Sequence, residues 1–224
     1  DSIKDIIHVP PYFYAAHKID EKWALGFGFN LPFGLSTEWE KTSYTKSVAT
    51  LSEIKAFNYN LNGSYKVNDK LSVALGADYV SLDATLNKMI GATELELEGK
   101  GDGWGWNAAA MYKLNDQWKL AANYRSPVKV IVDDATAKYG AVSNSAATKL
   151  TLPDTFQFGA AYKLNSKWQV SAGVDYTDWT TYRKIVIKSN TISVLTSGLT
   201  NTSTDIKNWK SVWAFRAGTE YKYS

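Results

Sequence analysis

The sequence predicts an all-β protein, an antiparallel up-and-down transmembrane β-barrel, of which these 224 residues form a segment of about nine strands. The first observation is a polar turn that occurs four times, at a spacing of about 50 residues. The second is the alternation of apolar and polar residues on both sides of each turn, which is typical of half-buried strands. The third is the aromatic residue that flanks most copies of the turn. The copies occupy residues 17–23, 65–71, 112–118 and 162–168.

When the four turns are aligned, the strand after each turn separates into two faces. In the last copy Trp168 and Val170 lie on the apolar face, and Gly173 and Asp175 lie on the small or polar face. A soluble β-sandwich could show this alternation, but its core has no reason to begin most strands with Trp. Aromatic rings at one level beside a polar turn are what a membrane–water interface selects. The eight steps from Trp168 to Tyr176 span about 20 Å in a strand tilted by about 40°, close to the lipid-facing band of a barrel.

Composition narrows the classes of function. No apolar run reaches the 18 residues of a transmembrane helix. The chain has no cysteine, which excludes a disulfide framework and thiolate metal sites. A net charge of +3 without basic clusters argues against nucleic acid and against an acidic partner. With two histidines, and without a Ser-His-Asp arrangement, a metal cluster or a phosphate-binding glycine loop, we expect neither an enzyme nor a cofactor.

Taken in order, the chain alternates between descending and ascending strands. We expect strands at about 11–17, 23–31, 57–65, 71–83, 104–112, 118–132, 156–162, 168–187 and 213–221. We expect long loops at about 32–53, 84–102, 133–148 and 188–208. Short turns at one end and long loops at the other are the asymmetry of an outer-membrane barrel. Nine is odd, whereas single-chain bacterial barrels close with an even number, and the chain begins at Asp1 without a signal peptide. We therefore expect a segment of something longer.

Several runs resemble the outer-membrane long-chain fatty acid transport proteins, the FadL family, which includes toluene-type hydrocarbon channels. The more specific runs are Asn-Leu-Pro-Phe-Gly at 30–34 and Tyr-Arg-Ser-Pro-Val-Lys at 124–129. Further runs lie at 22–28, 37–39, 103–107, 152–153 and 175–179, so that the resemblance covers nearly the whole chain. It implies a fourteen-stranded barrel with an N-terminal plug and a kink in one strand that opens the wall sideways. Residues 1–224 would then be a single barrel-domain segment covering the second to tenth strands, with no counterpart of the plug, the first strand or the last four strands.

The expected kink follows Asn30 and comprises Pro32, Phe33 and Gly34. Pro32 cannot donate to the sheet ladder and Gly34 has a free φ, so pairing should fail near the top of this strand. Inside a bilayer an unpaired backbone is tolerated only where it lines a cavity. The residues alone favour the plainer alternative, that the external loop starts here, whereas the resemblance implies a lateral gap.

Four polar residues share one inward level and predict a polar belt around the lumen: Asn30, Asp78, Arg125 and Asp175. An inward arginine flanked by carboxylates is more often a structural ion-pair network than a ligand site. Pro127, two residues after the arginine, predicts a bulge. Asp83 stands where the resemblance places a basic lumenal residue, which favours a neutral hydrophobic ligand over a carboxylate.

Met89 and Ile90 are apolar where an external loop should meet water. They predict part of an external hydrophobic groove, and packing against a neighbouring loop is an equally open alternative. Glu94, Glu96 and Glu98 alternate with leucines and predict an amphipathic hairpin arm.

Together these features predict a bacterial outer-membrane channel that takes up hydrophobic compounds, by resemblance long-chain fatty acids or aromatic hydrocarbons. The ligand would be captured at the external loops and released through a lateral opening in the wall. The other expected partners are outer-membrane lipid and lipopolysaccharide, and the full-length protein should be a monomeric barrel. The alternatives are a general diffusion porin for small polar solutes and a soluble β-sandwich binding module. A porin would need a charged lumen, whereas the inward positions are largely Gly, Ala, Ser and Asn.

Overall fold

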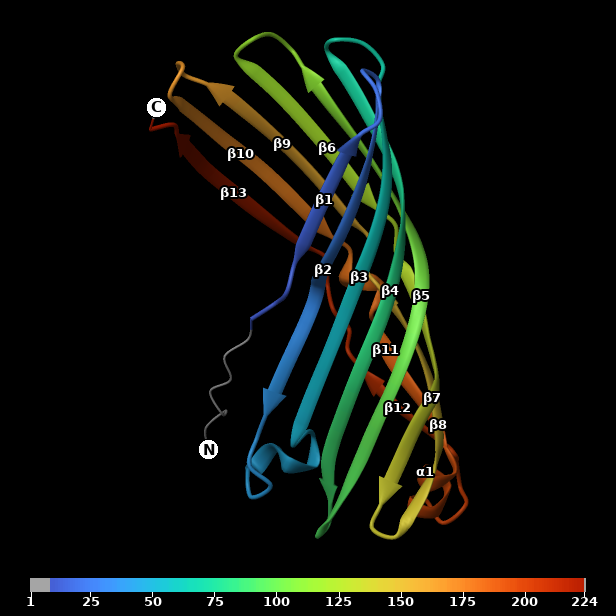
Figure 1. The fold of residues 1–224 in the computed structure, drawn as a ribbon. Helices are drawn as coiled ribbons and strands as arrows, with labels where there is room; N and C mark the ends of the chain where they lie inside the picture. Colours follow the sequence, from blue (N-terminus) through green and yellow to red (C-terminus); the bar gives the residue numbers. More distant parts are fainter. Residues whose placement is uncertain (1–8, 224) are drawn as a thin grey trace.

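The chain forms one antiparallel sheet of thirteen strands, nine of which make a continuous path in the order β1-β2-β3-β4-β5-β6-β9-β10-β13. The structure is a computed structural model that describes residues 9–223. Figure 1 shows the sheet curving strongly, with β1 at one edge of the path and β13 at the other. The strands are β1 Phe13–Lys18, β2 Trp23–Glu38, β3 Leu51–Lys66, β4 Leu71–Ile90, β5 Thr93–Lys113, β6 Trp118–Arg125, β7 Val128–Tyr139, β8 Val142–Leu152, β9 Thr155–Lys163, β10 Trp168–Thr177, β11 Lys184–Ser189, β12 Thr202–Ile206 and β13 Val212–Tyr221.

The nine-stranded path confirms the predicted fold class, an antiparallel up-and-down transmembrane barrel, here as an open sheet. The four recurrent turns gather at one end of the sheet, and the extended hairpins and the segments that carry the helices lie at the other (Figure 1). Three short helices lie in the longer connections: η1 Tyr44–Ser47, η2 Trp179–Thr181 and α1 Asn190–Leu195. Within the described residues, no helix is long and apolar enough to cross a membrane.

The four long loops expected from the sequence are wrong in extent, because the strands continue into them. β2 and β3 stay paired as far as Glu38 and Leu51, and β4 and β5 pair as far as Ile90 and Thr93. β7 and β8 occupy most of residues 133–148 and turn at Gly140, whose φ is +58°. β12 and α1 lie within residues 188–208. These upper segments lack the regularly spaced Trp and Tyr residues of the lower strands, and so their pairing is not apparent from the sequence.

The recurrent polar turn works through one side chain in each copy. Asn165 Oδ1 accepts hydrogen bonds from the backbone N–H groups of Lys167 and Trp168, both at 2.9 Å. Asp20, Asn68 and Asn115 occupy the same position in the other three copies and accept the equivalent pair of bonds. The side-chain acceptor satisfies donors that the tight turn would otherwise leave open, which is the predicted turn chemistry.

Two levels of aromatic residues line the outer face of the sheet. At the short-turn end each Trp packs on a Tyr of the next strand: Trp23–Tyr65 at 4.6 Å, Trp118–Tyr162 at 4.7 Å and Trp168–Tyr221 at 4.7 Å between ring centroids. The second level includes Tyr79–Trp104 at 5.0 Å, Trp106–Tyr124 at 5.3 Å and Tyr176–Trp213 at 4.7 Å. The three tryptophans of the first level are exposed and do not pack into a common core. The prediction that they face outward at one level is therefore confirmed.

A proline bulge in β2 reverses which alternate residues face the inside of the sheet. Asn30 pairs with Asn58 and Phe33 pairs with Ala56, so Leu31 and Pro32 together oppose a single residue of β3. Strict alternation would send Phe33 outward with Phe29. The extra residue instead turns Phe33 to the same side as Asn30 and the fully buried Ala56.

The same reversal occurs at two other prolines. Arg125, the last residue of β6, and Val128, the first of β7, both face inward although three positions separate them. The predicted bulge at Pro127 is therefore confirmed. At Pro153, Leu152 and Thr155 both face inward although three positions separate them. Leu152 pairs with the inward Val128, and Thr155 pairs with the inward Arg125. These reversals turn apolar residues such as Val130, Val132 and Leu150 inward, where they join Leu82 of the unbroken strand β4 in a buried cluster.

Candidate functional site

An apolar cavity of about 360 Å³ lies beside the β2 bulge, at the top of the inward-facing cluster. The bulge itself supplies Pro32, Phe33 and Gly34 to the cavity wall. Ser52, Ile54, Leu86, Leu150 and Leu152 line it from β3, β4 and β8, and Trp179, Tyr182, Ile185, Lys207 and Trp209 line it from the segments between β10 and β13. We call this cavity the upper pocket.

Four aromatic side chains pack together along one side of the upper pocket, and we call them the aromatic wall: Phe33, Trp179, Tyr182 and Trp209. Phe33 meets Trp179 edge-on at 5.3 Å, and Trp179 meets Trp209 edge-on at 4.9 Å between ring centroids. Tyr182 lies 4.9 Å from Trp209. Edge-to-face packing leaves ring faces available to a ligand, which suits an apolar or aromatic molecule.

Tyr182 is nearly fully buried in this wall. Burial raises the pKa of its phenol to about 12, and the nearby Asp205 carboxylate acts in the same direction. The hydroxyl is therefore neutral over the physiological range. Tyr182 therefore adds no negative charge to the upper pocket.

Hydrogen bonds around one carboxylate hold the aromatic wall in place. Asp178 Oδ1 accepts from Thr180 Oγ1 at 2.6 Å and from Ser211 Oγ at 2.7 Å. These bonds, with a third from the Thr180 backbone N–H, lower the pKa of Asp178. The carbonyl of Arg183 also accepts from the backbone N–H of Lys207 at 2.8 Å. The segments that carry Trp179 and Trp209 are thus fastened to each other.

A polar network lies next to the apolar cluster, on the side of the short turns. Asp78 is fully buried, and its carboxylate accepts from Asn58 at 3.0 Å, Asn60 at 2.9 Å, Asn107 at 2.7 Å and Arg125 at 2.6 Å. Asn58 also donates to Asn30 at 3.3 Å. The structure thus brings together three of the four residues expected in the polar belt. We call this group the Asp78 network.

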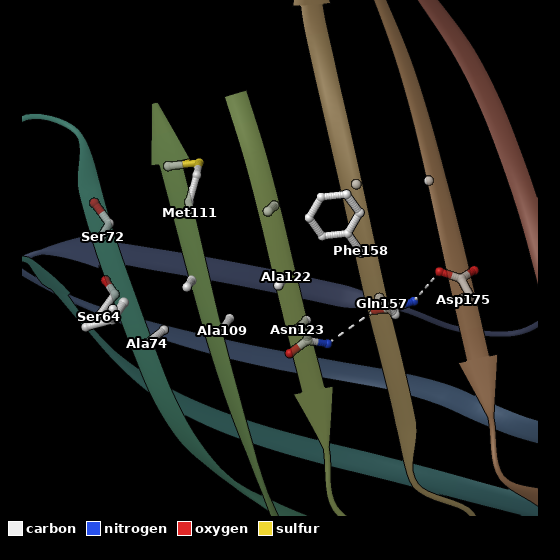
Figure 2. A pocket seen from close by; sticks show the side chains of 15 residues that line it. Ser64, Ser72, Ala74, Ala109, Met111, Ala122, Asn123, Gln157, Phe158 and Asp175 are labelled. Atoms are coloured by element: carbon white, nitrogen blue, oxygen red, sulfur yellow. Dashed lines mark hydrogen bonds between the residues drawn. The ribbon is translucent and has the colours of Figure 1, made fainter. Parts of the chain in front are cut away.

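Asp175, the fourth residue of the expected belt, belongs to a separate network. It accepts from Gln157 Nε2 at 3.2 Å and pairs with Arg216 of β13. Asn123 donates to Gln157 in turn at 3.2 Å. Figure 2 shows this chain of polar side chains in a wide, shallow hollow of about 620 Å³. Towards the short turns the hollow is lined mainly by small residues, among them Ser64, Ser72, Ala74 and Ala109.

The remaining residues singled out from the sequence lie away from the upper pocket. Met89 and Ile90 are half-buried at the end of β4, where the β4–β5 hairpin turns. The hydroxyl of Tyr139 donates to the backbone carbonyl of Ile90 at 3.2 Å. The lumenal placement of Asp83 is wrong: its neighbours Leu82 and Ala84 belong to the inward cluster, so strand alternation turns Asp83 outward, where it pairs with Lys100 at 3.7 Å.

Sequence reasoning missed most of the aromatic wall. Trp179 and Tyr182 lie within the strand expected at about 168–187, and Trp209 lies between the loop expected at about 188–208 and the last expected strand. A usable signal was present, because Trp209 directly follows a polar stretch in which tryptophan is unusual. The amides Asn58, Asn60 and Asn107 were also missed, although their inward parity follows from the alternation of β3 and β5.

Comparison with known proteins identifies relatives along the whole chain. The profile of a family described as "Outer membrane protein transport protein (OMPP1/FadL/TodX)" matches residues 3–224. The long-chain fatty acid transport protein of Salmonella typhi is 24% identical over 265 aligned residues, which cover 100% of this chain and 58% of that protein. The chain spans about half the length of the curated relatives that it matches.

Solved structures show the same fold. A FadL homologue of Pseudomonas aeruginosa superposes with a TM-score of 0.81 at 17% identity, over 96% of this chain and 57% of the other. The toluene transporter TbuX of Ralstonia pickettii superposes with a TM-score of 0.77 at 16% identity, over 96% of this chain and 65% of the other. At these identities the superpositions establish the barrel fold alone.

Proposed function

Because this chain belongs to the outer membrane protein transport protein family (OMPP1/FadL/TodX), we propose that it forms much of the wall of a channel that takes up hydrophobic compounds. The family and its named relatives place it in the bacterial outer membrane. The relatives include a long-chain fatty acid transporter and a toluene transporter. Long-chain fatty acids and aromatic hydrocarbons are therefore the candidate ligands. The observation that carries the proposal is the upper pocket, an apolar cavity on the inward face beside an interrupted strand.

The upper pocket offers a hydrophobic ligand a stable site between the external loops and the rest of the lumen. Each CH₂ group removed from water contributes about 0.8 kcal/mol. Next to the pocket, towards the short turns, the Asp78 network presents amides and a charged pair. A hydrophobic molecule gains nothing by crossing such a layer. We propose that it leaves sideways instead.

The β2 bulge lies where a sideways exit is needed. Leu31 and Pro32 have no ladder partner on β3. On the opposite side, β1 pairs with β2 only up to Phe29, and above that point β3 is the one strand among residues 9–223 that pairs with β2. Pro32, Phe33 and Gly34 line the upper pocket from this stretch. These features support a lateral opening between the pocket and the lipid.

Replacing Pro32 by Val and Gly34 by Thr tests the lateral exit. Val restores a backbone donor and Thr favours extended pairing, so the wall should close. The new Thr Cβ would lie 3.0 Å from the flexible end of Leu31, which can move. Uptake of a labelled long-chain fatty acid or of toluene by cells should fall at least about tenfold, since exposing two CH₂ groups to water already costs about 1.6 kcal/mol.

Pro127→Val is the matched control, because it makes the same proline-to-valine change at a strand interruption away from the upper pocket and should leave uptake near the wild-type rate. Heat-dependent gel mobility checks that each variant is folded. Wild-type uptake in a folded double variant would exclude lateral release. Rapid entry of small sugars without any gain for hydrophobic solutes would instead support the diffusion porin.

Capture at the external loops is a further part of the proposal. Met89 and Ile90 at the tip of the β4–β5 hairpin would offer an incoming ligand its first apolar contact. We also expect contacts with lipid and lipopolysaccharide around a monomeric barrel.

A further inference from the structure

The upper pocket is almost without charge. Among its lining residues in the described part of the chain, Lys207 is the one basic or acidic side chain. The ammonium of Lys207 lies 2.6 Å from Oδ2 of Asp205. The one cation that could attract an anionic ligand therefore already has a carboxylate partner.

The fold fixes this partner beside the pocket. Asp205 belongs to β12 and pairs in register with Ile185 of β11, itself a pocket residue. The backbone N–H of Lys207 is bound by the carbonyl of Arg183. The backbone positions of both members of the ion pair are therefore fixed beside the pocket, Asp205 by the β11–β12 pairing and Lys207 by its hydrogen bond to Arg183.

An ion pair at this position treats a carboxylate and an uncharged ligand differently. A carboxylate would have to compete with Asp205 for the ammonium and would lie close to a like charge, a cost that an alcohol or a hydrocarbon does not meet. The remaining polar groups of the lining include the hydroxyls of Ser52 and Tyr182, and these carry no charge. The aromatic wall attracts rings and chains alike.

We propose that Asp205 determines the charge class of the ligand: by neutralising Lys207 it makes the upper pocket select uncharged hydrophobic molecules over their carboxylate counterparts. This inference rests on the hydrophobic pocket of the proposed function and adds the rule by which that pocket discriminates. It does not depend on Asp83, which faces outward.

The test compares two probes of equal chain length, decanol and decanoate. Their dissociation constants are measured by titration calorimetry on the natural protein in detergent, with partition into protein-free micelles subtracted. Wild-type protein should bind decanol more tightly than decanoate. Asp205→Asn should shift the preference towards decanoate by roughly fivefold, the size expected for freeing a partly exposed charge. Decanol affinity should change less than twofold.

Two further variants make the result specific. Lys207→Met in the Asp205→Asn background should remove the gain in decanoate binding, because the freed cation is gone. Asp83→Asn opens the outward pair with Lys100 and should leave the preference unchanged. Lys207→Met alone leaves Asp205 without its cation and should weaken decanoate binding relative to decanol still further, so the charge rule stays testable even if Asp205→Asn folds poorly.

A wild-type preference for decanoate would overturn the charge rule, and so would an unchanged preference in folded Asp205→Asn protein. In both cases the pocket still binds a hydrophobic ligand, and the proposed function stands. If the wild-type protein binds neither probe, the pocket itself fails as a ligand site and the rule falls with it.

Discussion

At Asp78 one buried carboxylate is the common acceptor for side chains from three neighbouring strands. Asn58 and Asn60 reach it from β3, Asn107 from β5 and Arg125 from β6. A buried charge is tolerable only when it is paired and its oxygen atoms are hydrogen-bonded, and both conditions hold here. The network therefore fixes the relative positions of the strands beneath the apolar cluster.

Replacing Asp78 by Ala should leave Arg125 and three amides without their acceptor. We expect the free energy of unfolding in detergent, measured with urea, to fall by about 3 kcal/mol. Asp83→Ala breaks an exposed pair on the other face of the same strand and should cost less than about 1 kcal/mol. Equal, small losses in the two variants would show that the Asp78 network contributes little to stability.

At the scale of the element, the recurring turn and the proline bulge have opposite effects. The turn brings two strands into register, because its Asn or Asp side chain satisfies the open backbone donors. The bulge interrupts register within a strand and changes the face of every residue beyond it. The lower barrel depends on the first effect and the upper pocket on the second.

Asn165→Ala should destabilise the β9–β10 hairpin by about 1–2 kcal/mol, because two hydrogen bonds of 2.9 Å lose their acceptor. Asn165→Asp keeps an acceptor at the same place and should lose less than half as much. Urea unfolding in detergent gives both values. Equal losses in the two variants would mean that the turn does not depend on this acceptor.

At the scale of the whole molecule, the sheet has an apolar outer face in contact with lipid and an inner face that changes along its length. Small and polar residues line the hollow near the short turns, the Asp78 network follows, and the apolar cluster and upper pocket lie nearest the long connections. This layering would let a hydrophobic ligand enter the pocket, and the polar network beneath it would disfavour further passage along the lumen.

Adjacent residues of β4 test the two faces directly. Leu75 is 64% exposed on the outer face between the two aromatic levels, whereas Ala74 lines the inner hollow. Leu75→Arg should lower the free energy of unfolding from lipid bilayers by about 2–4 kcal/mol, because it places a charge near the bilayer midplane. Ala74→Arg should cost less than about 1 kcal/mol, since the inner face is wet. A larger loss for Ala74→Arg would reverse the assignment of the faces.

The sequence by itself determined the repeated turns, the nine strands of the path and the aromatic level beside the turns. These features are local: a side chain bonds its own turn, and alternation with period two separates the faces within one strand. It also located the bulges at Pro32 and Pro127, because proline cannot donate to a ladder. Strand alternation also explains why three of the four expected belt residues are joined by hydrogen bonds. They lie in strands whose alternation is unbroken from the turn up to the belt.

Only the tertiary structure decided what lies above the bulges. Each bulge resets the alternation, so the inward position of Phe33 and Val128 cannot be read from the pattern below it. The aromatic wall joins Phe33 to Trp179, almost 150 positions later in the chain, and curvature of the sheet, not sequence spacing, brings them together. Lys207 and Asp205 are two residues apart, yet their importance depends on a cavity whose other walls come from β2, β3, β4 and β8. A pocket is made by strands that meet across the inside of the sheet, and local alternation contains no information about which strands those are.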